Sequence, residues 1–211
     1  MPDLPRRKKA RGPKETRGRI LEAAADLFAR HGYHATSMRQ VARRARVVPA
    51  AIYNHFESKE RLFLAAFLEK APQRALAEAL DAADGVTAEA LLRNGLHRMR
   101  QAMASRLDEL RLVFVEVLEF DGKHAPDLAG LFLPRILNFV QRLQDAPGNH
   151  RPVSAILVMR AVLGLFMSFT MTQAFISRVP GLEDDPAALD GLGDILLYGI
   201  MNPAAPPKGQ P

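Results

Sequence analysis

The chain has 211 residues, of which 48% are apolar, so it can form one large domain or a small domain beside a larger one. It contains no cysteine, which excludes a disulfide framework, an iron–sulfur cluster and a cysteine-based zinc site. Its net charge of +6 is unevenly placed: residues 1–62 hold fifteen Lys and Arg against six Asp and Glu, whereas the rest holds fourteen against seventeen. A basic end on a mildly acidic remainder is typical of a protein that contacts nucleic acid at one end.

Residues 1–15 form a basic arm with almost nothing to bury, so we expect it to be disordered on its own. The arm fits both a segment that follows the phosphates or the minor groove of DNA and a solvated tail, and the sequence leaves both open. No apolar run follows the basic residues, so no secretory signal is predicted, and together with the lack of cysteine this favours a cytoplasmic location. A first helix is expected from about Thr16 to His31, ending at Gly32. Its inward stripe is Ile20, Ala24, Leu27 and Phe28.

Two short helices joined by a three-residue turn follow, at residues 37–45 and 49–56. Ser37 is placed as an N-cap, and Gln40 three residues later completes the capping-box pattern. Pro49 suits the first position of the second helix. The apolar positions with helical spacing are Met38, Val41, Ala42 and Ala45 on the first helix and Ile52 and Phe56 on the second. This spacing is that of a helix-turn-helix, whose second helix fits the major groove of DNA.

The segment from about Thr16 to Phe67 resembles the DNA-binding domain of the tetracycline-repressor (TetR) family of bacterial transcriptional regulators. The resemblance covers about a quarter of the chain and rests on residues 20–24, 27–28, 32–33, 36–39, 41–42, 45, 47, 52–53, 55–56 and 58–63. It implies a three-helix DNA-reading domain, a helical effector-binding body and a homodimer.

The chain departs from the family at two turn positions. Arg46 stands where the family usually has a glycine in left-handed conformation, which would cost about 1 kcal/mol if the turn keeps that shape. Val48 stands where Ser or Thr usually caps the second helix, and losing such a cap costs roughly 0.5–2 kcal/mol. Arg46 is also a candidate for an added phosphate contact.

Only helices are predicted further on, so the expected fold is all-α. A helix from Lys59 to about Ala82 is expected to bend or break at Pro72. Five more are expected near residues 87–106, 107–120, 128–144, 153–178 and 186–201, with Gly122 and Pro126 breaking the chain before the third. The predicted organisation is a basic arm (1–15), a helix-turn-helix domain (16–67), a helical ligand-binding and dimerisation domain (68–201) and a tail (202–211).

The helix at Val153–Arg178 is the most apolar segment and is long enough to span a bilayer. A long helix that is apolar all round also fits a buried interface between two copies. We favour the interface, since a stripe of small residues would let two helices approach closely and a membrane span would leave the other helices unexplained. The stripe is Ala161, Gly164, Ser168 and Thr172. The helix at Pro186–Met201 would complete a four-helix seam.

The predicted contacts with a DNA operator follow from the helix pair and the resemblance. Phosphate contacts are assigned to Arg39, Arg43, Arg46 and Lys59, supported by Thr36, Ser37, Tyr53 and His55. Base edges are assigned to Pro49, Ala50, Ala51 and Asn54, where Asn can pair with adenine.

An apolar or amphipathic effector is expected in the body. The residues that are candidates to line its cavity are Met99, Met103, Phe114, Leu118, Phe132, Phe139, Met167, Met171 and Gln173, although ordinary core packing explains each one too.

Catalysis, a metal and a cofactor are not predicted. The sequence lacks a Gly-rich phosphate loop, a Gly-x-Ser-x-Gly elbow and a His-Glu-x-x-His pair. Glu116 and Glu119 are neighbours on a helix, and we interpret them as a solvated face rather than catalytic carboxylates. The chain is therefore interpreted as a ligand-responsive repressor, and the alternatives are an architectural DNA-binding protein without an effector and a membrane-bound regulator.

Overall fold

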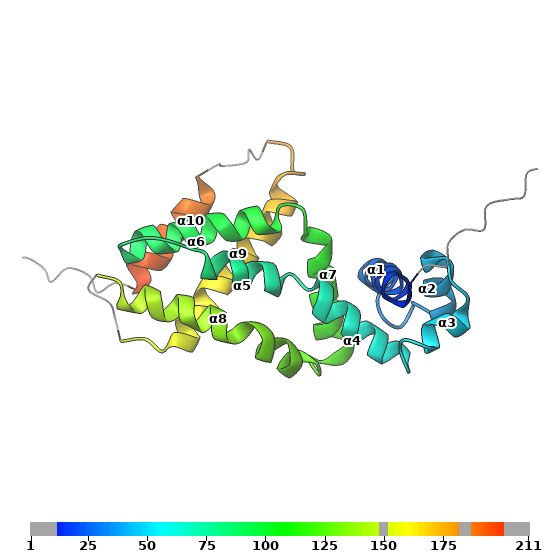
Figure 1. The fold of residues 1–211 in the computed structure, drawn as a ribbon. Helices are drawn as coiled ribbons and strands as arrows, with labels where there is room; N and C mark the ends of the chain where they lie inside the picture. The colour runs from blue at the N-terminus through cyan, green and yellow to red at the C-terminus, as the bar shows by residue number, and fades with distance from the viewer. Residues whose placement is uncertain (1–11, 148–151, 182–186, 201–211) are drawn as a thin grey trace, which may run out of the picture. The chain divides into compact units, whose positions relative to one another are not determined.

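The computed structural model describes residues 12–147, 152–181 and 187–200 (Figure 1). These residues form helices and no strand, which confirms the predicted all-α fold. In chain order the helices are α1 (Pro13–His31), α2 (Met38–Ala45), α3 (Pro49–Tyr53), α4 (Lys59–Lys70), α5 (Gln73–Asp81), α6 (Ala88–Met103), α7 (Leu107–Phe120), α8 (Ala125–Asp145), α9 (Ala155–Ile176) and α10 (Ala188–Ile200). The arm at 1–11, the predicted start of the last helix at Pro186 and the tail at 202–211 lie outside the described residues.

The chain divides into two compact units. The N-terminal unit comprises Met1–Ala71 and Leu107–Leu128, and the C-terminal unit comprises Pro72–Arg106 and Ala129–Pro211. The first unit therefore contains α7, which the sequence places in the ligand-binding domain. The chain passes between the units after residues 71, 106 and 128.

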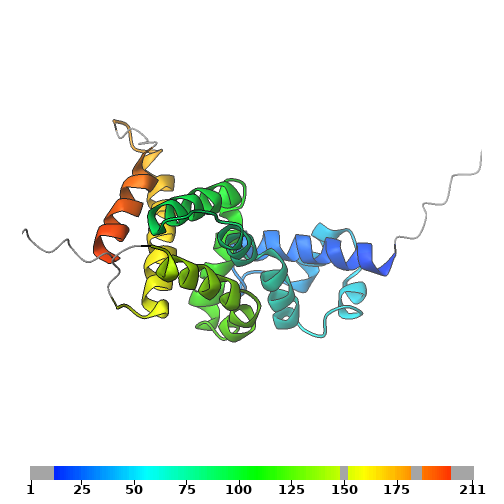
Figure 2. The same cartoon turned by 60° about the vertical axis from the view of Figure 1, so that its left-hand side comes forward.

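The core of the N-terminal unit is built around α1, which packs against α2, α4 and α7 (Figure 2). The rings of Phe28 and Phe63 meet edge to face with centroids 5.4 Å apart, and Phe120 of α7 stacks on Phe63 at 4.6 Å. Leu112 and Val115 of α7 are buried in the same cluster. Because aromatic pairs add to the stabilisation from apolar burial, α7 is firmly part of this unit.

Prolines account for three of the observed helix boundaries. Pro72 interrupts the predicted 59–82 helix and separates α4 from α5, as expected. Pro13 opens α1 three residues before the expected start, because proline suits a first helical turn, where no intrahelical partner for its nitrogen is needed. The same property lets Pro126 lie in the first turn of α8, so the prediction that it breaks the chain is wrong. Gly122 does end the preceding segment, with φ 72°.

The C-terminal unit is a layered set of helices in which α6 packs against α5, α9 and α10 (Figure 1). Gly95 of α6 allows close packing, since an added Cβ would come within 2.9 Å of the Phe139 ring. Arg93 and His97 tie α6 to α10, because Arg93 pairs with Asp190 and Asp194 and the His97 Nε2 lies 2.9 Å from Asp190 Oδ1. A hydrogen bond to Glu89 raises the pKa of Arg93 above its ordinary value.

Helix α9 is the most apolar element of this unit. Among the described residues one segment, Ala155–Gln173, is long and apolar enough by length and composition to cross a membrane. Only 17% of this segment is buried within the single chain. Its apolar surface is therefore available to a further partner.

Candidate nucleic-acid interface

Helix α2 forms as the sequence predicts. The Ser37 hydroxyl accepts a hydrogen bond from the Gln40 backbone N–H, and the Gln40 side chain accepts one from the Ser37 N–H at 2.6 Å. This reciprocal cap satisfies two of the N–H groups left free at a helix start. Val41, Ala42 and Ala45 are buried against α1 and its neighbours. The opposite face of α2 is therefore left to solvent.

Two of the three arginines on α2 are available on that exposed face. Arg44 is paired with Asp26 of α1, with 2.9 Å between Nη2 and Oδ2, and Asp26 also pairs with Arg30. Arg39 and Arg43 are exposed, which suits the phosphate contacts predicted for them. The ion pair with Asp26 explains why the Arg44 side chain points back to α1.

The turn after α2 has the left-handed conformation expected there. Arg46 has φ 54° and ψ 48°, and its N–H bonds back to the Ala42 and Arg43 carbonyls. The predicted strain at a non-glycine residue is thus present. Val48 occupies the N-cap position before α3, makes no side-chain cap hydrogen bond and is 66% exposed. Both departures from the family pattern therefore have the structural effect that the sequence indicates.

Helix α3 buries one residue and presents most of the others. Ile52 is fully buried, whereas Pro49, Ala50, Tyr53 and Asn54 are exposed and Ala51 and His55 are half-buried. Tyr53 is 56% exposed, so its ring and hydroxyl are accessible from solvent. A short helix with small residues and hydrogen-bonding tips on its outer face fits the major groove.

Two predicted phosphate contacts have internal roles in the structure. Thr36 is 1% exposed, and its hydroxyl donates to the Gly32 carbonyl at 2.8 Å and the Leu27 carbonyl at 3.3 Å. Its side chain is not presented to a ligand, so Thr36 is corrected to a residue that supports the loop. The Lys59 ammonium donates to the Tyr33 and Thr36 carbonyls at 2.9 Å each and lies 4.1 Å from the Tyr33 ring centroid. A phosphate contact by Lys59 stays a prediction. The Lys59 ammonium already contacts two backbone carbonyls and one aromatic ring.

The loop before α2 is held by a carboxylate that the sequence pattern places in solvent. Glu119 of α7 accepts hydrogen bonds from the backbone N–H groups of Tyr33 at 3.0 Å and His34 at 2.9 Å. Gly32, at φ 80°, leaves the space, because an added Cβ would lie 2.5 Å from Glu119 Oε1. Burial is the main cause that raises the pKa of the Tyr33 phenol, with the nearby Glu60 carboxylate adding to it.

Glu116 is likewise not part of a solvated face. Its side chain is 4% exposed and its Oε2 lies 2.8 Å from Nδ1 of His124, whose backbone N–H donates to Oε1 at 2.7 Å. The prediction of a solvated Glu116–Glu119 face is therefore wrong, since both carboxylates fix segments of the N-terminal unit. Residues three apart lie on the same side of a helix, and this side of α7 faces other segments of the N-terminal unit.

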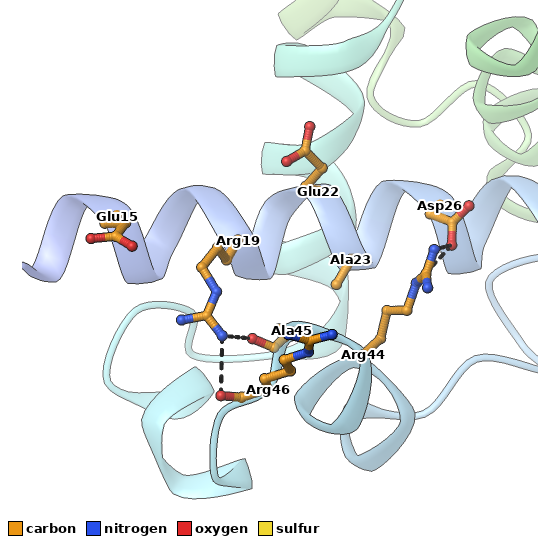
Figure 3. Close-up of a pocket in the computed structure, with 8 residues that line it drawn as sticks. All are labelled: Glu15, Arg19, Glu22, Ala23, Asp26, Arg44, Ala45 and Arg46. Carbon is orange, nitrogen blue, oxygen red and sulfur yellow. Dashed lines mark hydrogen bonds and ion pairs between the residues drawn. The ribbon is translucent and has the colours of Figure 1, made fainter. Parts of the chain in front are cut away.

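Arg19 of α1 is a further residue that sequence reasoning missed. Its guanidinium donates to the Arg46 carbonyl at 3.1 Å and to the Ala45 carbonyl, at the end of α2 (Figure 3). The one signal in the sequence is the position of Arg19 beside the predicted inward residue Ile20, which does not specify a partner.

The residues predicted to line an effector cavity do not share one environment. Met99 and Phe139 are fully buried, and Met103 and Phe132 nearly so. Met167 and Gln173 are half-buried, and Met171 is 37% exposed. Phe114 and Leu118 lie on α7 in the N-terminal unit, and Leu118 is 76% exposed. A cavity formed by all nine stays a prediction.

Comparisons with known proteins agree with this geometry. Residues 20–66, which include α2 and α3, match the model of a family described as bacterial regulatory proteins, tetR family. The chain is 31% identical over 138 residues to the HTH-type transcriptional regulator UidR of Escherichia coli K12, an alignment that covers 62% of this chain and 66% of UidR.

Two solved structures have a similar fold. SCO4942 from Streptomyces coelicolor, described as a transcriptional regulator, is 25% identical with a TM-score of 0.66, and the match covers 89% of this chain and 99% of that one. FadR of Bacillus subtilis, solved in complex with stearoyl-CoA, is 20% identical with a TM-score of 0.60, and the match covers 87% of this chain and 98% of FadR.

A helix-turn-helix with an exposed second helix, joined to a helical C-terminal unit, defines the class of these bacterial regulators. The chain belongs to the TetR family.

Proposed function

We propose that this protein is a sequence-specific DNA-binding repressor that acts in the bacterial cytoplasm as a homodimer on a palindromic operator and is released by a small molecule. The observation that carries the proposal is the outer face of α3, where Tyr53 and Asn54 are exposed beside small residues. The basic charge of the first 62 residues would bring this face to DNA.

On DNA, two copies would place their α3 helices in successive major grooves about 34–36 Å apart. Arg39, Arg43 and Arg46 would lie along phosphates, with the Ser37 and Tyr53 hydroxyls and His55 beside them. Pro49, Ala50, Ala51 and Asn54 would face base edges. Phosphate contacts would set the register and base contacts the sequence preference.

The exposed apolar surface of α9, the residues directly after it and α10 supports the homodimer. Seven large apolar side chains there are at least 37% exposed, and such a surface in a soluble protein marks an interaction site. They are Ile156, Leu157, Met171, Phe175, Val179, Ile195 and Tyr198. The Gly164, Ser168 and Thr172 positions of the small-residue stripe are exposed too, and an added Cβ at Gly164 would meet nothing within 4 Å. A second copy would cover this surface, so a membrane is not needed to explain it.

An apolar or amphipathic effector would be bound by the C-terminal unit. Support comes from methionines and phenylalanines such as Met99, Met103 and Phe132, which can adapt to varied ligands. Stearoyl-CoA bound to the similar fold of FadR makes acyl-chain compounds the first class to test. The effector would have to bind the form that no longer matches the operator more tightly, by roughly 1–3 kcal/mol. Repression is the expected sign, because an occupied promoter excludes polymerase.

The test is selection of genomic fragments by the purified protein at near-physiological salt, followed by footprinting. We expect a short palindrome protected with half-sites one helical turn apart. Uniform recovery of all fragments would show an architectural DNA-binding protein instead.

The docking geometry is tested by Tyr53→Ala, with Tyr53→Phe as the matched variant that removes only the hydroxyl. We expect Tyr53→Ala to weaken operator binding while the dimer, measured by sedimentation, stays intact. Unchanged operator affinity would contradict the placement of α3.

A further inference from the structure

The left-handed turn between α2 and α3 is held from outside by one side chain. Arg19 lies on α1, twenty-six residues before Ala45, and its Nη2 donates to the Ala45 and Arg46 carbonyls (Figure 3). These carbonyls lie at the C-terminus of α2, where helix carbonyl groups lack intrahelical partners. A cation there also interacts favourably with the helix dipole.

Arg46 is the residue that needs this support. Its φ of 54° is one that glycine adopts freely and a residue with a Cβ adopts at a cost. The hydrogen bonds from Arg19 flank this residue, one on its own carbonyl and one on the preceding carbonyl. They therefore restrain both peptide groups that would rotate if Arg46 relaxed to a right-handed conformation.

The groups around Arg19 place its guanidinium beside the turn carbonyls. Arg19 lines an open cleft of about 550 Å³ between α1 and the end of α2, together with Arg44 and Arg46 and the acidic residues Glu15, Glu22 and Asp26. Arg44 is held by Asp26 on the other side of the cleft, so it does not compete for the turn carbonyls. The turn leads directly into α3, so its shape sets the direction of the exposed face of that helix.

We propose that Arg19 is a positioning residue for DNA recognition, which allows an arginine to replace glycine at position 46 without changing the orientation of α3. It acts through the turn carbonyls and not by touching DNA itself. The inference rests on the proposed operator binding. It predicts that Arg19 and residue 46 are energetically coupled, and that an Arg46→Gly chain needs Arg19 less.

The experiment is a double-mutant cycle of Arg19→Ala and Arg46→Gly, measured as affinity for the operator duplex selected by the wild type and for a scrambled duplex, over a series of salt concentrations. We expect Arg19→Ala to weaken operator binding by about 10-fold, because charge-assisted hydrogen bonds are among the strongest in proteins. In the Arg46→Gly background the same change should weaken it by about 3-fold or less, since glycine keeps the turn without help.

Three controls separate positioning from other roles. The salt dependence should keep its slope in Arg19→Ala, whereas removing an arginine that neutralises one phosphate would lower the slope by about 0.9. Binding to the scrambled duplex should change little. Arg30→Ala removes the same charge from an ion pair on α1 that does not touch the turn, and it should bind the operator like the wild type.

The outcomes are distinct. Equal losses in both backgrounds, a reduced salt slope or an equal loss on scrambled DNA would overturn the inference while leaving the proposed function intact. A wild-type protein that selects no operator would overturn the proposed function first. If Arg19→Ala does not fold, Arg19→Lys takes its place in the cycle, because a lysine can reach one carbonyl and should show the same coupling at smaller size.

Discussion

The two turns that flank α2 each contain a residue with positive φ, but they are built in opposite ways. Before α2 the chain turns at Gly32, with φ 80°, and the carboxylate of Glu119 accepts the backbone N–H groups that follow. After α2 it turns at Arg46, with φ 54°, and the guanidinium of Arg19 donates to carbonyls. In each turn the backbone groups are thus bound by a side chain of complementary charge. The N–H groups are bound by a carboxylate, and the carbonyls are bound by a guanidinium.

The difference between the turns lies in the space around the Cβ position. At Gly32 an added Cβ would come within 2.5 Å of Glu119 Oε1, so glycine is required both for its backbone conformation and for the approach of the carboxylate. At Arg46 the side chain is exposed and only the conformation favours glycine. One factor therefore disfavours a side chain at position 46, whereas two disfavour one at position 32.

The largest expected effect is therefore that of Gly32→Ala. We expect a loss of about 2–4 kcal/mol in the free energy of unfolding, because the backbone at φ 80° and ψ 171° is essentially restricted to glycine and the Glu119 carboxylate is displaced. Chemical denaturation measures it. Gly122→Ala is the matched control, because Gly122 has φ 72° and an added Cβ would meet nothing within 4 Å, so only the cost of the conformation, about 1 kcal/mol, should remain. Equal losses at the two glycines would show that Glu119 does not restrict position 32.

Glu119→Ala tests the carboxylate itself. We expect a loss of about 2 kcal/mol, because two charge-assisted hydrogen bonds to backbone N–H groups disappear, and faster hydrogen exchange at the Tyr33 and His34 amides. The control is Asp108→Ala, which removes a carboxylate from the same helix. The Asp108 side chain is 86% exposed, so this change should alter stability by less than about 0.5 kcal/mol. Protected amides in Glu119→Ala would mean that the loop is held by packing alone.

The sequence predicts what local signals specify. The capping box of α2, its buried face and the interruption at Pro72 all depend on residues within a turn or two of each other, and the structure confirms them. The left-handed conformation of Arg46 is expected because the family resemblance identifies the turn position.

Contacts between segments that are far apart in the sequence cannot be predicted from such local signals. Glu119 meets Tyr33 across 86 residues, and no local pattern shows that the polar side of α7 faces the loop before α2. For the same reason the sequence places Thr36 on DNA although it is buried, and α7 in the C-terminal domain although it packs on α1. Polar residues three apart predict a shared side of a helix but not what that side touches.

Arg46→Gly should have a smaller effect, which is opposite in sign for the free energy of unfolding and for operator affinity. Relief of the left-handed strain should raise the free energy of unfolding by about 0.5–1 kcal/mol. Operator affinity should fall at the same time if Arg46 neutralises a phosphate, and the salt slope should then be lower by about 0.9. A decrease in stability would contradict the comparison between the turns, because it would mean that the arginine at this position is not strained.

The smallest effect concerns a second carboxylate contact near the first turn. Glu60 on α4 accepts a hydrogen bond from Lys123 at 2.6 Å, and this bond is the main cause that lowers the pKa of Glu60 below its ordinary 4.5. A carboxylate whose pKa is lowered by folding stabilises the protein above its unfolded pKa, and it loses that contribution as the pH falls through the folded pKa. The wild type should therefore melt slightly above Glu60→Gln at pH 7, and the difference should shrink below about pH 4.5 and in high salt, because the Glu60 side chain is 41% exposed. Thermal melts across pH measure this, with the exposed neighbour Glu57→Gln as the control. A difference in melting temperature that persists at pH 3 would show that Glu60 acts through packing rather than charge. Glu119 would then be the carboxylate whose charge holds this part of the N-terminal unit.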